Sequence, residues 1–333
     1  MLKNIDIQNY RAIKQISLNN FANINIFTGA ANAGKSSILE AVYFLCNINI
    51  DTLNNILKIR NFTDEKDMFS ALFYDYNTKN NIKINGIIDD DITCSISSGN
   101  SIVYDSLDNW LNIIKINYDI DLLGVSYYAF LDNNLKLQMQ LNSKSVSLDF
   151  PSDYSAEYLA SFSNYDTLKN NLAKILVNNN SKKLLNKYLK EFDDNIEDIM
   201  FIGNIISVSY KYLSNAVNIK SMGKGFYTYL TILSAVLSGS KIIIIDEIEN
   251  GIHFSLMKKL IDNIINISKE NNIQFFISTH SKEFLEIFNN QIQKADINIK
   301  LYNIYDKDKI INAIEYNKDQ ICSMIYNQNE IRD

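Results

Sequence analysis

Hydrophobic and polar residues alternate in two parts of the chain, residues 1–28 and residues 81–150. Period-two alternation over four to eight residues is typical of β-strands that bury one face. The pattern therefore predicts short strands before residue 28 and an antiparallel β-lobe over residues 81–150. The strand candidates within this lobe are residues 82–88, 93–97, 124–130, 136–141 and 146–148.

Apolar residues recur three and four positions apart from Ala156 to about Ile202, and this period predicts two amphipathic helices. We expect a helical insertion over residues 154–202. Its Lys- and Asn-rich faces could contact DNA or a partner, although solvated surface is the simpler interpretation. The same period predicts further helices over residues 226–237, 254–268 and 282–292.

Two apolar runs, residues 242–245 and 274–278, show no alternation, which predicts central strands buried on both faces. Polar residues follow each run. Asp246 and Glu247 come after the first run, and His280 comes after the second. Open α/β sheets bind ligands at the carboxyl ends of their strands, so these three side chains are candidates for a site.

A glycine-rich loop follows the strand predicted up to residue 28 and precedes a helix predicted over residues 35–48. Two glycines flank four residues, and a Lys-Ser pair follows directly, which is the spacing of a P-loop. The glycines allow backbone N–H groups to turn inward around a phosphate at a helix N-terminus. The residues expected to bind nucleotide in this loop are Gly29, Ala30, Ala31, Asn32, Ala33, Gly34, Lys35, Ser36 and Ser37.

Each polar side chain of the predicted site has an expected role in binding or cleaving a nucleoside triphosphate. Lys35 would reach the β- and γ-phosphates, and Ser36 and Asp246 would hold Mg²⁺. Glu247 would orient and deprotonate the attacking water, unless the two acids merely cap the next helix. His280 would donate a hydrogen bond to the γ-phosphate.

Three further signals each admit two interpretations. Arg11, one of only three arginines, could reach the nucleotide or be a solvated turn residue. His253 could contact the nucleotide or be an ordinary surface residue. Ser221, Gly223 and Gly225 precede a helical pattern, and they could form a second anion-binding helix start or simply begin the helix.

Composition limits the class of protein. The 333 residues are 47% hydrophobic, enough to build one large domain or two ordinary ones. A net charge of −6 disfavours nonspecific nucleic-acid binding by the whole chain, although a local basic groove stays open. Cys46, Cys94 and Cys322 lack metal-ligand spacing and predict reduced thiols. No leader is evident and no apolar run approaches the roughly 20 residues that span a bilayer, so we expect a soluble, cytoplasmic protein without a membrane partner.

The order of these motifs resembles the ATP-binding-cassette (ABC) superfamily of ATPases. Within it the chain is similar to AAA family and OLD-type proteins, relatives of SMC and RecF heads, chiefly through residues 245–254 and 278–283. The resemblance implies an α/β P-loop NTPase fold of ABC-ATPase type, in which a mixed central sheet carries an antiparallel β-lobe and a helical insertion. Residues 1–333 would form a single head, with a nucleotide-binding core built from residues 1–48 and 203–333.

The resemblance also assigns the motifs and a mechanism. Residues 29–37 become Walker A, residues 221–225 the signature, residues 242–247 Walker B and residues 249–253 the D-loop; His280 becomes the switch histidine, and Arg11 an arginine near the nucleotide. The signature reads Ser-Met-Gly-Lys-Gly in place of Leu-Ser-Gly-Gly-Gln. The family mechanism implies a homodimer that sandwiches two ATP molecules with Mg²⁺. Each ATP would be bound by Walker A of one subunit and by Ser221 and Gly223 of the other.

Two classes of function follow from the resemblance. The first is an ATP-hydrolysing subunit whose dimerisation controls a separately encoded effector, a nuclease or toxin, in prokaryotic anti-phage defence. The second is a DNA-repair or chromosome-maintenance ATPase that binds DNA directly. A transporter subunit fits less well, because the β-lobe and the helical insertion are unlike a short transporter cassette. OLD nucleases carry a Toprim domain after the ATPase, and we expect none here, because only about fifty residues follow His280.

Overall fold

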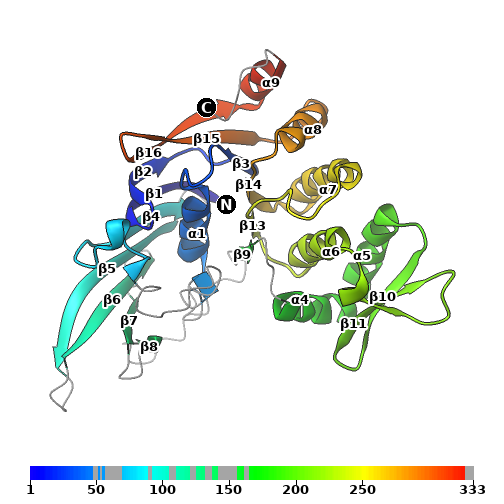
Figure 1. Ribbon diagram of the computed structural model, residues 1–333, viewed down its shortest axis with the longest axis horizontal. Helices are drawn as coiled ribbons and strands as arrows, with labels where there is room; N and C mark the ends of the chain where they lie inside the picture. Colours follow the sequence, from blue (N-terminus) through cyan, green and yellow to red (C-terminus); the bar gives the residue numbers. More distant parts are fainter. Residues whose placement is uncertain are drawn as a thin grey trace.

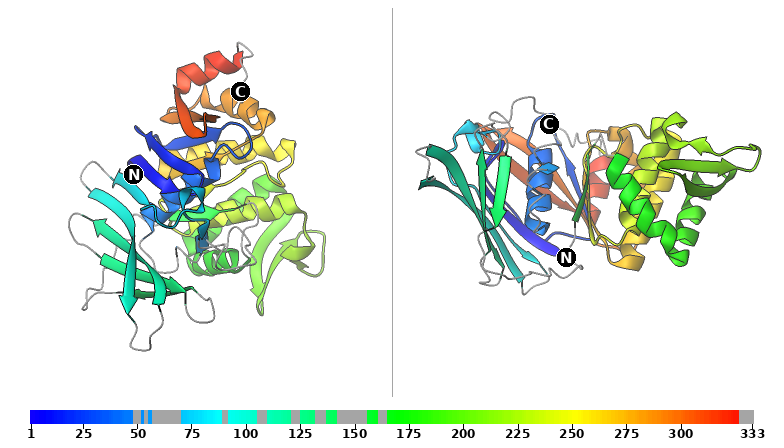
Figure 2. Two further views of the ribbon diagram at one scale, coloured as in Figure 1. Left: turned by 60° about the vertical axis from the view of Figure 1, so that its left-hand side comes forward. Right: turned by 90° about the horizontal axis from the view of Figure 1, so that it is seen from below.

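Two large β-sheets enclose one helix, and the remaining helices cover the far face of one sheet (Figure 1). The architecture is visible from below in Figure 2, where helix α1 lies between the sheets. The structure is a computed structural model, and it describes residues 1–47, 52, 55, 56, 70–88, 92–104, 110–120, 125–131, 137–141, 156–160 and 165–326, with the backbone alone between 92 and 141.

The central sheet has six strands in the order β16-β15-β3-β14-β13-β9. Only β16 runs antiparallel to its neighbour, so the sheet is mixed, as predicted. Every residue of β3, β13 and β14 is buried, which confirms the two unbroken apolar runs as central strands. The strands are β3 (Ile24–Thr28), β9 (Ala156–Leu159), β13 (Ile242–Ile245), β14 (Gln274–Ser278), β15 (Ile299–Lys307) and β16 (Ile310–Asn317).

The second sheet is antiparallel and has seven strands in the order β2-β1-β4-β5-β6-β7-β8. It confirms an antiparallel β-lobe, but the lobe is continuous with the N-terminal strands, because β4 pairs with β1. The strand β6 was not among the predicted strands, and the candidate at residues 146–148 lies outside the described residues. The strands are β1 (Leu2–Tyr10), β2 (Ile13–Leu18), β4 (Lys83–Ile88), β5 (Ile92–Tyr104), β6 (Trp110–Ile120), β7 (Val125–Leu131) and β8 (Leu137–Leu141).

Helix α1 (Lys35–Cys46) follows the P-loop and is buried on almost every side. One hydrophobic cluster joins its side chains to β1 and β4 of the antiparallel sheet and to β13 and β14 of the central sheet. A helix that is apolar all round belongs in such a position, because each of its faces meets another element. Helix α1 is therefore held by both sheets.

The other face of the central sheet is covered by helices α4, α6, α7 and α8 (Figure 1). A small sheet, β10-β11-β12, extends beyond them next to α5. These elements are α4 (Tyr165–Val177), α5 (Asn179–Phe192), α6 (Lys224–Leu237), α7 (Phe254–Asn271), α8 (Lys282–Ile292), α9 (Lys318–Tyr326), β10 (Ile196–Ile202), β11 (Ile205–Tyr210), β12 (Val217–Asn218) and the short 3-10 helices η1 (Tyr74–Tyr76) and η3 (Ile219–Ser221).

The prediction of helix from Ala156 to Ile202 is wrong at both ends. Residues 156–159 form β9, which pairs in parallel with β13, and residues 196–202 form β10. Both stretches are too short for their apolar spacing to distinguish a helix from a strand. Pairing with β13, more than eighty residues away along the chain, fixes β9 as a strand. Helices α4 and α5 between them confirm the two predicted amphipathic helices.

Two observations bear on the expected class of protein. Among the residues that the structure describes, no helix is both long and apolar enough to cross a bilayer. Cys46 is buried and Cys322 half-buried, and neither forms a disulfide bond in the described part of the chain, while the side chain of Cys94 lies outside the described residues.

Candidate nucleotide site

The P-loop takes a backbone path that requires glycine. Gly29 and Gly34 have φ angles of +132° and +97°, in the region that favours glycine. A β-carbon on Gly29 would lie 2.0 Å from the carbonyl oxygen of Ile304, so the loop passes directly against β15. Both positions therefore require glycine, because the backbone angles favour it and because a side chain at Gly29 would collide with β15.

The N-terminus of α1 is prepared for an anion. Gly34 is the N-cap, and no side chain within the described residues caps the helix there. The first turn contains no acidic residue that would compete with a phosphate. Lys35 is buried, and its Nζ donates to the carbonyl oxygens of Gly29 (3.0 Å) and Ala30 (2.7 Å). The ammonium group thus lies over the loop, as a phosphate-binding lysine must.

The strands β3, β14 and β13 end at the same edge of the central sheet. They are parallel, and their register aligns Ile26 with Ile277 and Ile277 with Ile245. The backbone N–H of Thr279 then donates to the carbonyl oxygen of Phe27 at 3.0 Å. The sheet therefore brings the P-loop, His280 and the Asp246–Glu247 pair to one edge, where open α/β sheets bind ligands.

Asp246 is held by two hydroxyl groups from neighbouring strands. Ser278 Oγ donates to one carboxylate oxygen at 2.5 Å, and Tyr158 of β9 donates to the other at 3.1 Å. Neither residue was predicted from the sequence to belong to the site. Ser278 is the last residue of a buried strand, which was a usable signal, whereas Tyr158 had been assigned to a helix.

Glu247 has a φ angle of +56°, which is unusual for a residue with a side chain. This left-handed conformation costs about 1 kcal/mol and is typical of functional sites. The backbone N–H of Glu247 donates to Ser278 Oγ at 2.8 Å, and one of its carboxylate oxygens lies 4.0 Å from His280 Nε2. The predicted base and the predicted switch histidine therefore face each other.

Glu249 connects the turn after β13 to the end of β14. Its carboxylate accepts hydrogen bonds from Thr279 Oγ1 at 2.8 Å and from the backbone N–H of His280 at 2.6 Å. The resemblance to ABC ATPases assigns Glu249 to the D-loop, and no role was predicted for its side chain. His253 is the N-cap of α7, and its Nδ1 accepts from the backbone N–H of Ser255 at 3.3 Å, which gives its ring a local structural partner.

The guanidinium of Arg11 is bound within the protein. Its Nε lies 2.5 Å from a carboxylate oxygen of Glu40 in α1, and its Nη atoms lie near the carbonyl oxygens of Ile56 and Ala71 at 3.5 and 3.4 Å. Arg11 and Glu40 are both buried, so the solvated alternative does not hold. A contact between Arg11 and the nucleotide stays a prediction.

The signature residues lie at the start of α6, which begins at Lys224 and not at the predicted residue 226. Ser221 and Gly223 are exposed, and a β-carbon on Gly223 would meet no atom of the described residues within 4 Å. Gly225 faces the other way, since its β-carbon would lie 2.9 Å from the carbonyl oxygen of Gly251. The signature therefore presents one side to solvent and packs its other side on the D-loop.

Comparisons with known proteins agree with this arrangement. Residues 24–286 match the family described as "AAA domain, putative AbiEii toxin, Type IV TA system". A protein of Helicobacter pylori named ATP/GTP phosphatase is 30% identical over 353 aligned residues, which cover 93% of this chain and 94% of that protein. The DNA replication and repair protein RecF of Streptococcus thermophilus is 27% identical over 201 residues, 58% of this chain and 45% of RecF.

Solved structures show the same fold. A head domain of SMC bound to the C-terminal winged-helix domain of ScpA superposes with a TM-score of 0.54 at 13% identity, covering 95% of this chain and 97% of that one. A second SMC head with an extended coiled coil, bound to the C-terminal domain of ScpA derived from Pyrococcus furiosus, gives 0.52 at 12% identity, with 99% of both chains covered. From its family match, its full-length relative and its P-loop fold, the chain belongs to this AAA family and is an ABC-type ATPase related to SMC and RecF heads.

Proposed function

We propose that this ATPase binds ATP with Mg²⁺ between two copies of the chain, and that hydrolysis opens the dimer to control a partner protein. The convergence of β3, β14 and β13 at one sheet edge carries the proposal. That edge holds a phosphate-binding loop, a metal-binding carboxylate, a candidate base and a histidine. These four parts are what hydrolysis of a nucleoside triphosphate requires.

The residues present fit a magnesium ion that is held mainly by the nucleotide. Within the described part of the chain, no three His, Cys, Asp or Glu side chains are grouped to hold a metal by themselves. Mg²⁺ typically takes only one or two protein ligands and binds phosphate oxygens and water for the rest. Ser36 at the start of α1 and Asp246 would be those ligands, and the ion would neutralise charge on the phosphates.

Glu247 would act on the attacking water, and Lys35 would stabilise the charge on the phosphates. His280, 4.0 Å from Glu247, would donate to the γ-phosphate. The hydroxyl of Ser278 binds both acidic residues. It donates to the carboxylate of Asp246 and accepts from the backbone N–H of Glu247. This shared partner would keep the candidate metal ligand and the candidate base at a constant position relative to each other.

The exposed signature supports a dimer. Ser221 and Gly223 face solvent at an uncapped helix start, so they are accessible to a nucleotide bound by another copy of the chain. A nucleotide bound by one subunit and contacted by the signature of the other would place its γ-phosphate in the interface between them. Loss of that phosphate would then weaken the dimer.

A protein partner is supported by exposed apolar residues on the small sheet. Ile202 and Ile205 flank the β10–β11 turn, and Tyr212 and Leu213 follow β11; all four are exposed. The two SMC heads described above were solved with a bound domain of ScpA. The family description names a putative toxin of a Type IV toxin–antitoxin system, which links the family to such systems. A separately encoded nuclease or toxin as effector, in anti-phage defence, is part of the proposal.

Direct DNA binding, as RecF-like repair would require, is the second candidate function. It is supported by the partial similarity to RecF and opposed by the net charge of −6. The two functions differ in salt dependence, because DNA affinity that rests on phosphate contacts falls steeply with salt. DNA binding by the ATP-bound dimer that weakens steeply with salt, yet is still measurable at physiological salt, would favour repair over effector control.

The experiment for the dimer is Glu247→Gln, which keeps the shape of the side chain but removes the base. We expect this variant to bind ATP, to hydrolyse it at least 100-fold more slowly, and to elute as a dimer in size-exclusion chromatography with Mg-ATP. Lys35→Ala should stay monomeric under the same conditions, because it cannot retain the phosphates. A Glu247→Gln protein that stays monomeric with ATP bound would refute the sandwich.

A further inference from the structure

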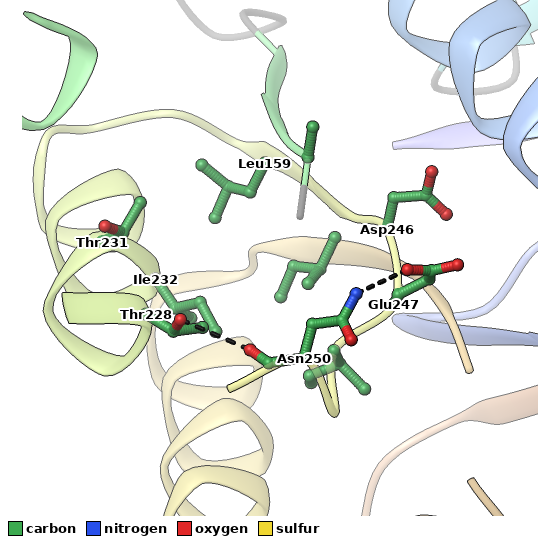
Figure 3. Close-up of a pocket in the computed structure, with 10 residues that line it drawn as sticks. Leu159, Thr228, Thr231, Ile232, Asp246, Glu247 and Asn250 are labelled. Atoms are coloured by element: carbon green, nitrogen blue, oxygen red, sulfur yellow. Dashed lines mark hydrogen bonds between the residues drawn. The ribbon is translucent and has the colours of Figure 1, made fainter. Parts of the chain in front are cut away.

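Asn250 lies in the turn after β13 and contacts the candidate base directly. Its side-chain Nδ2 donates to a carboxylate oxygen of Glu247, Oε2, at 2.5 Å, and its backbone N–H donates to the carbonyl oxygen of the same residue at 2.9 Å (Figure 3). The other carboxylate oxygen, Oε1, is the one near His280. The amide thus holds one carboxylate oxygen of Glu247, while the other lies near His280.

The same residue also contacts the helix that starts at the signature. Thr228 of α6 donates its hydroxyl to the backbone carbonyl oxygen of Asn250 at 3.4 Å (Figure 3). The next residue, Gly251, has a φ angle of +79°, and a β-carbon there would lie 2.7 Å from the side chain of Lys224. The first turn of α6 therefore lies directly on the turn that carries Asn250.

These contacts form one continuous path. It runs from the signature end of α6, through the Thr228 hydroxyl and the backbone of Asn250, to the amide of Asn250 and the carboxylate of Glu247. Beside the path, between β9, α6 and the turn, lies a cavity of about 20 Å³ lined in part by Thr231 and Asp246, which is room for about one water. The turn is thus packed on α6 and has a small space next to it.

We propose that Asn250 is a positioning residue that makes the orientation of Glu247 depend on the position of the signature helix. This inference rests on the proposed role of Glu247 as base. A nucleotide contacted by the signature of the second copy would move or fix the start of α6, and Asn250 would pass that change to the carboxylate. Hydrolysis would then be favoured only in the closed dimer.

The first test is Asn250→Ala, measured as steady-state ATP hydrolysis and as binding of a fluorescent ATP analogue. We expect kcat to fall about 10- to 100-fold, as for other residues that orient a catalytic group. The dissociation constant for the analogue should change less than 2-fold, because Asn250 contacts the base and not the P-loop. An unchanged kcat would overturn the inference.

A double-mutant cycle separates positioning from a general structural role. In Glu247→Gln protein the base is absent, so adding Asn250→Ala should change the residual rate by less than 2-fold. A structural defect would instead lower the residual rate by the same factor as in the wild type, and that result would refute positioning. If Glu247→Gln itself hydrolyses ATP normally, the proposed function fails before this inference is reached.

The link to the signature helix is tested by Thr228→Val, with Thr231→Val as the matched control. Both residues lie on α6, but the Thr231 hydroxyl donates within the helix, to the carbonyl oxygen of Tyr227. We expect Thr228→Val to lower kcat about 2- to 10-fold, the worth of one hydrogen bond, and Thr231→Val to leave it unchanged. Equal rates for the two variants would show that α6 does not act through Asn250.

Discussion

The ion pair between Arg11 and Glu40 joins the first β-hairpin to the phosphate-binding helix. Both side chains are buried, and Glu40 lies in the second turn of α1. A buried charge pair contributes little net stability, but removing one partner leaves the other charge without compensation. The resemblance to ABC ATPases predicts this arginine near the nucleotide, and the structure places it against α1, the helix that follows the P-loop.

Substitution of Arg11 distinguishes these two roles. Arg11→Ala should reduce the free energy of unfolding by about 3–5 kcal/mol, measured by urea denaturation, because Glu40 stays buried and charged. The apolar replacement Arg11→Met with Glu40→Leu should recover most of this loss. If the recovered double variant binds ATP like the wild type, Arg11 serves the fold; a folded variant with strongly reduced ATP affinity would assign Arg11 to the nucleotide.

At the scale of elements, β9 is attached to two helices through Glu157. Its carboxylate accepts from Asn171 of α4 at 2.5 Å and lies 3.5 Å from the hydroxyls of Ser238 and Ser240 near the end of α6. Burial raises the pKa of Glu157, while the hydrogen bond from Asn171 opposes the rise. The folded state therefore favours the protonated acid. The contribution of Glu157 to stability is fully present at pH values below the pKa of this group in the unfolded chain. It is lost as the pH rises through the pKa of the group in the folded protein.

Glu157→Gln removes this charge but keeps the acceptor for Asn171. We expect the variant to have a higher Tm than the wild type at pH 8, because the cost of a buried carboxylate is gone. The difference should shrink toward zero at pH 4, where the wild-type acid is protonated. Thermal melts of both proteins at the two pH values check this, and a difference independent of pH would contradict it.

The elements also show what the sequence could and could not predict. Helix α8 has the predicted bounds, Lys282–Ile292, with Ser281 as N-cap, because capping and apolar period are local signals. The P-loop and Walker B motifs could be predicted from the sequence for the same reason, because their spacing is local. Strand β9 was missed because its identity depends on pairing with β13, and the contacts of Tyr158 and Asn250 were missed with it, because they join segments far apart in sequence.

At the scale of the whole molecule, Gly223 is a position where a substitution can test dimer formation without disturbing the fold of the subunit. The residue has an ordinary φ angle of −63°, and its β-carbon would meet no neighbour, so a side chain there should not disturb the subunit. In the proposed dimer the same position faces a triphosphate bound by the second copy. A negative charge at Gly223 would repel it.

Gly223→Asp should therefore melt within about 2 °C of the wild type, as expected for a surface substitution away from special features, yet fail to dimerise with Mg-ATP when combined with Glu247→Gln. Asn204→Asp, at an exposed position of the β10–β11 turn, is the control for the added charge and should still dimerise. Analytical ultracentrifugation of both proteins measures the outcome. Dimerisation of the Gly223→Asp protein would exclude the signature from the interface.

The burial of α1 between the two sheets gives the antiparallel sheet a mechanical property. Because α1 shares one hydrophobic core with β1 and β4, we expect a tilt of the helix to move the antiparallel sheet with it. Strand β5 has 13 residues and spans about 40 Å, so a tilt of about 5° at the helix swings the far end of the sheet by about 3–4 Å. A tilt of α1 on nucleotide binding would thus displace the outer strands of this sheet more than the helix itself.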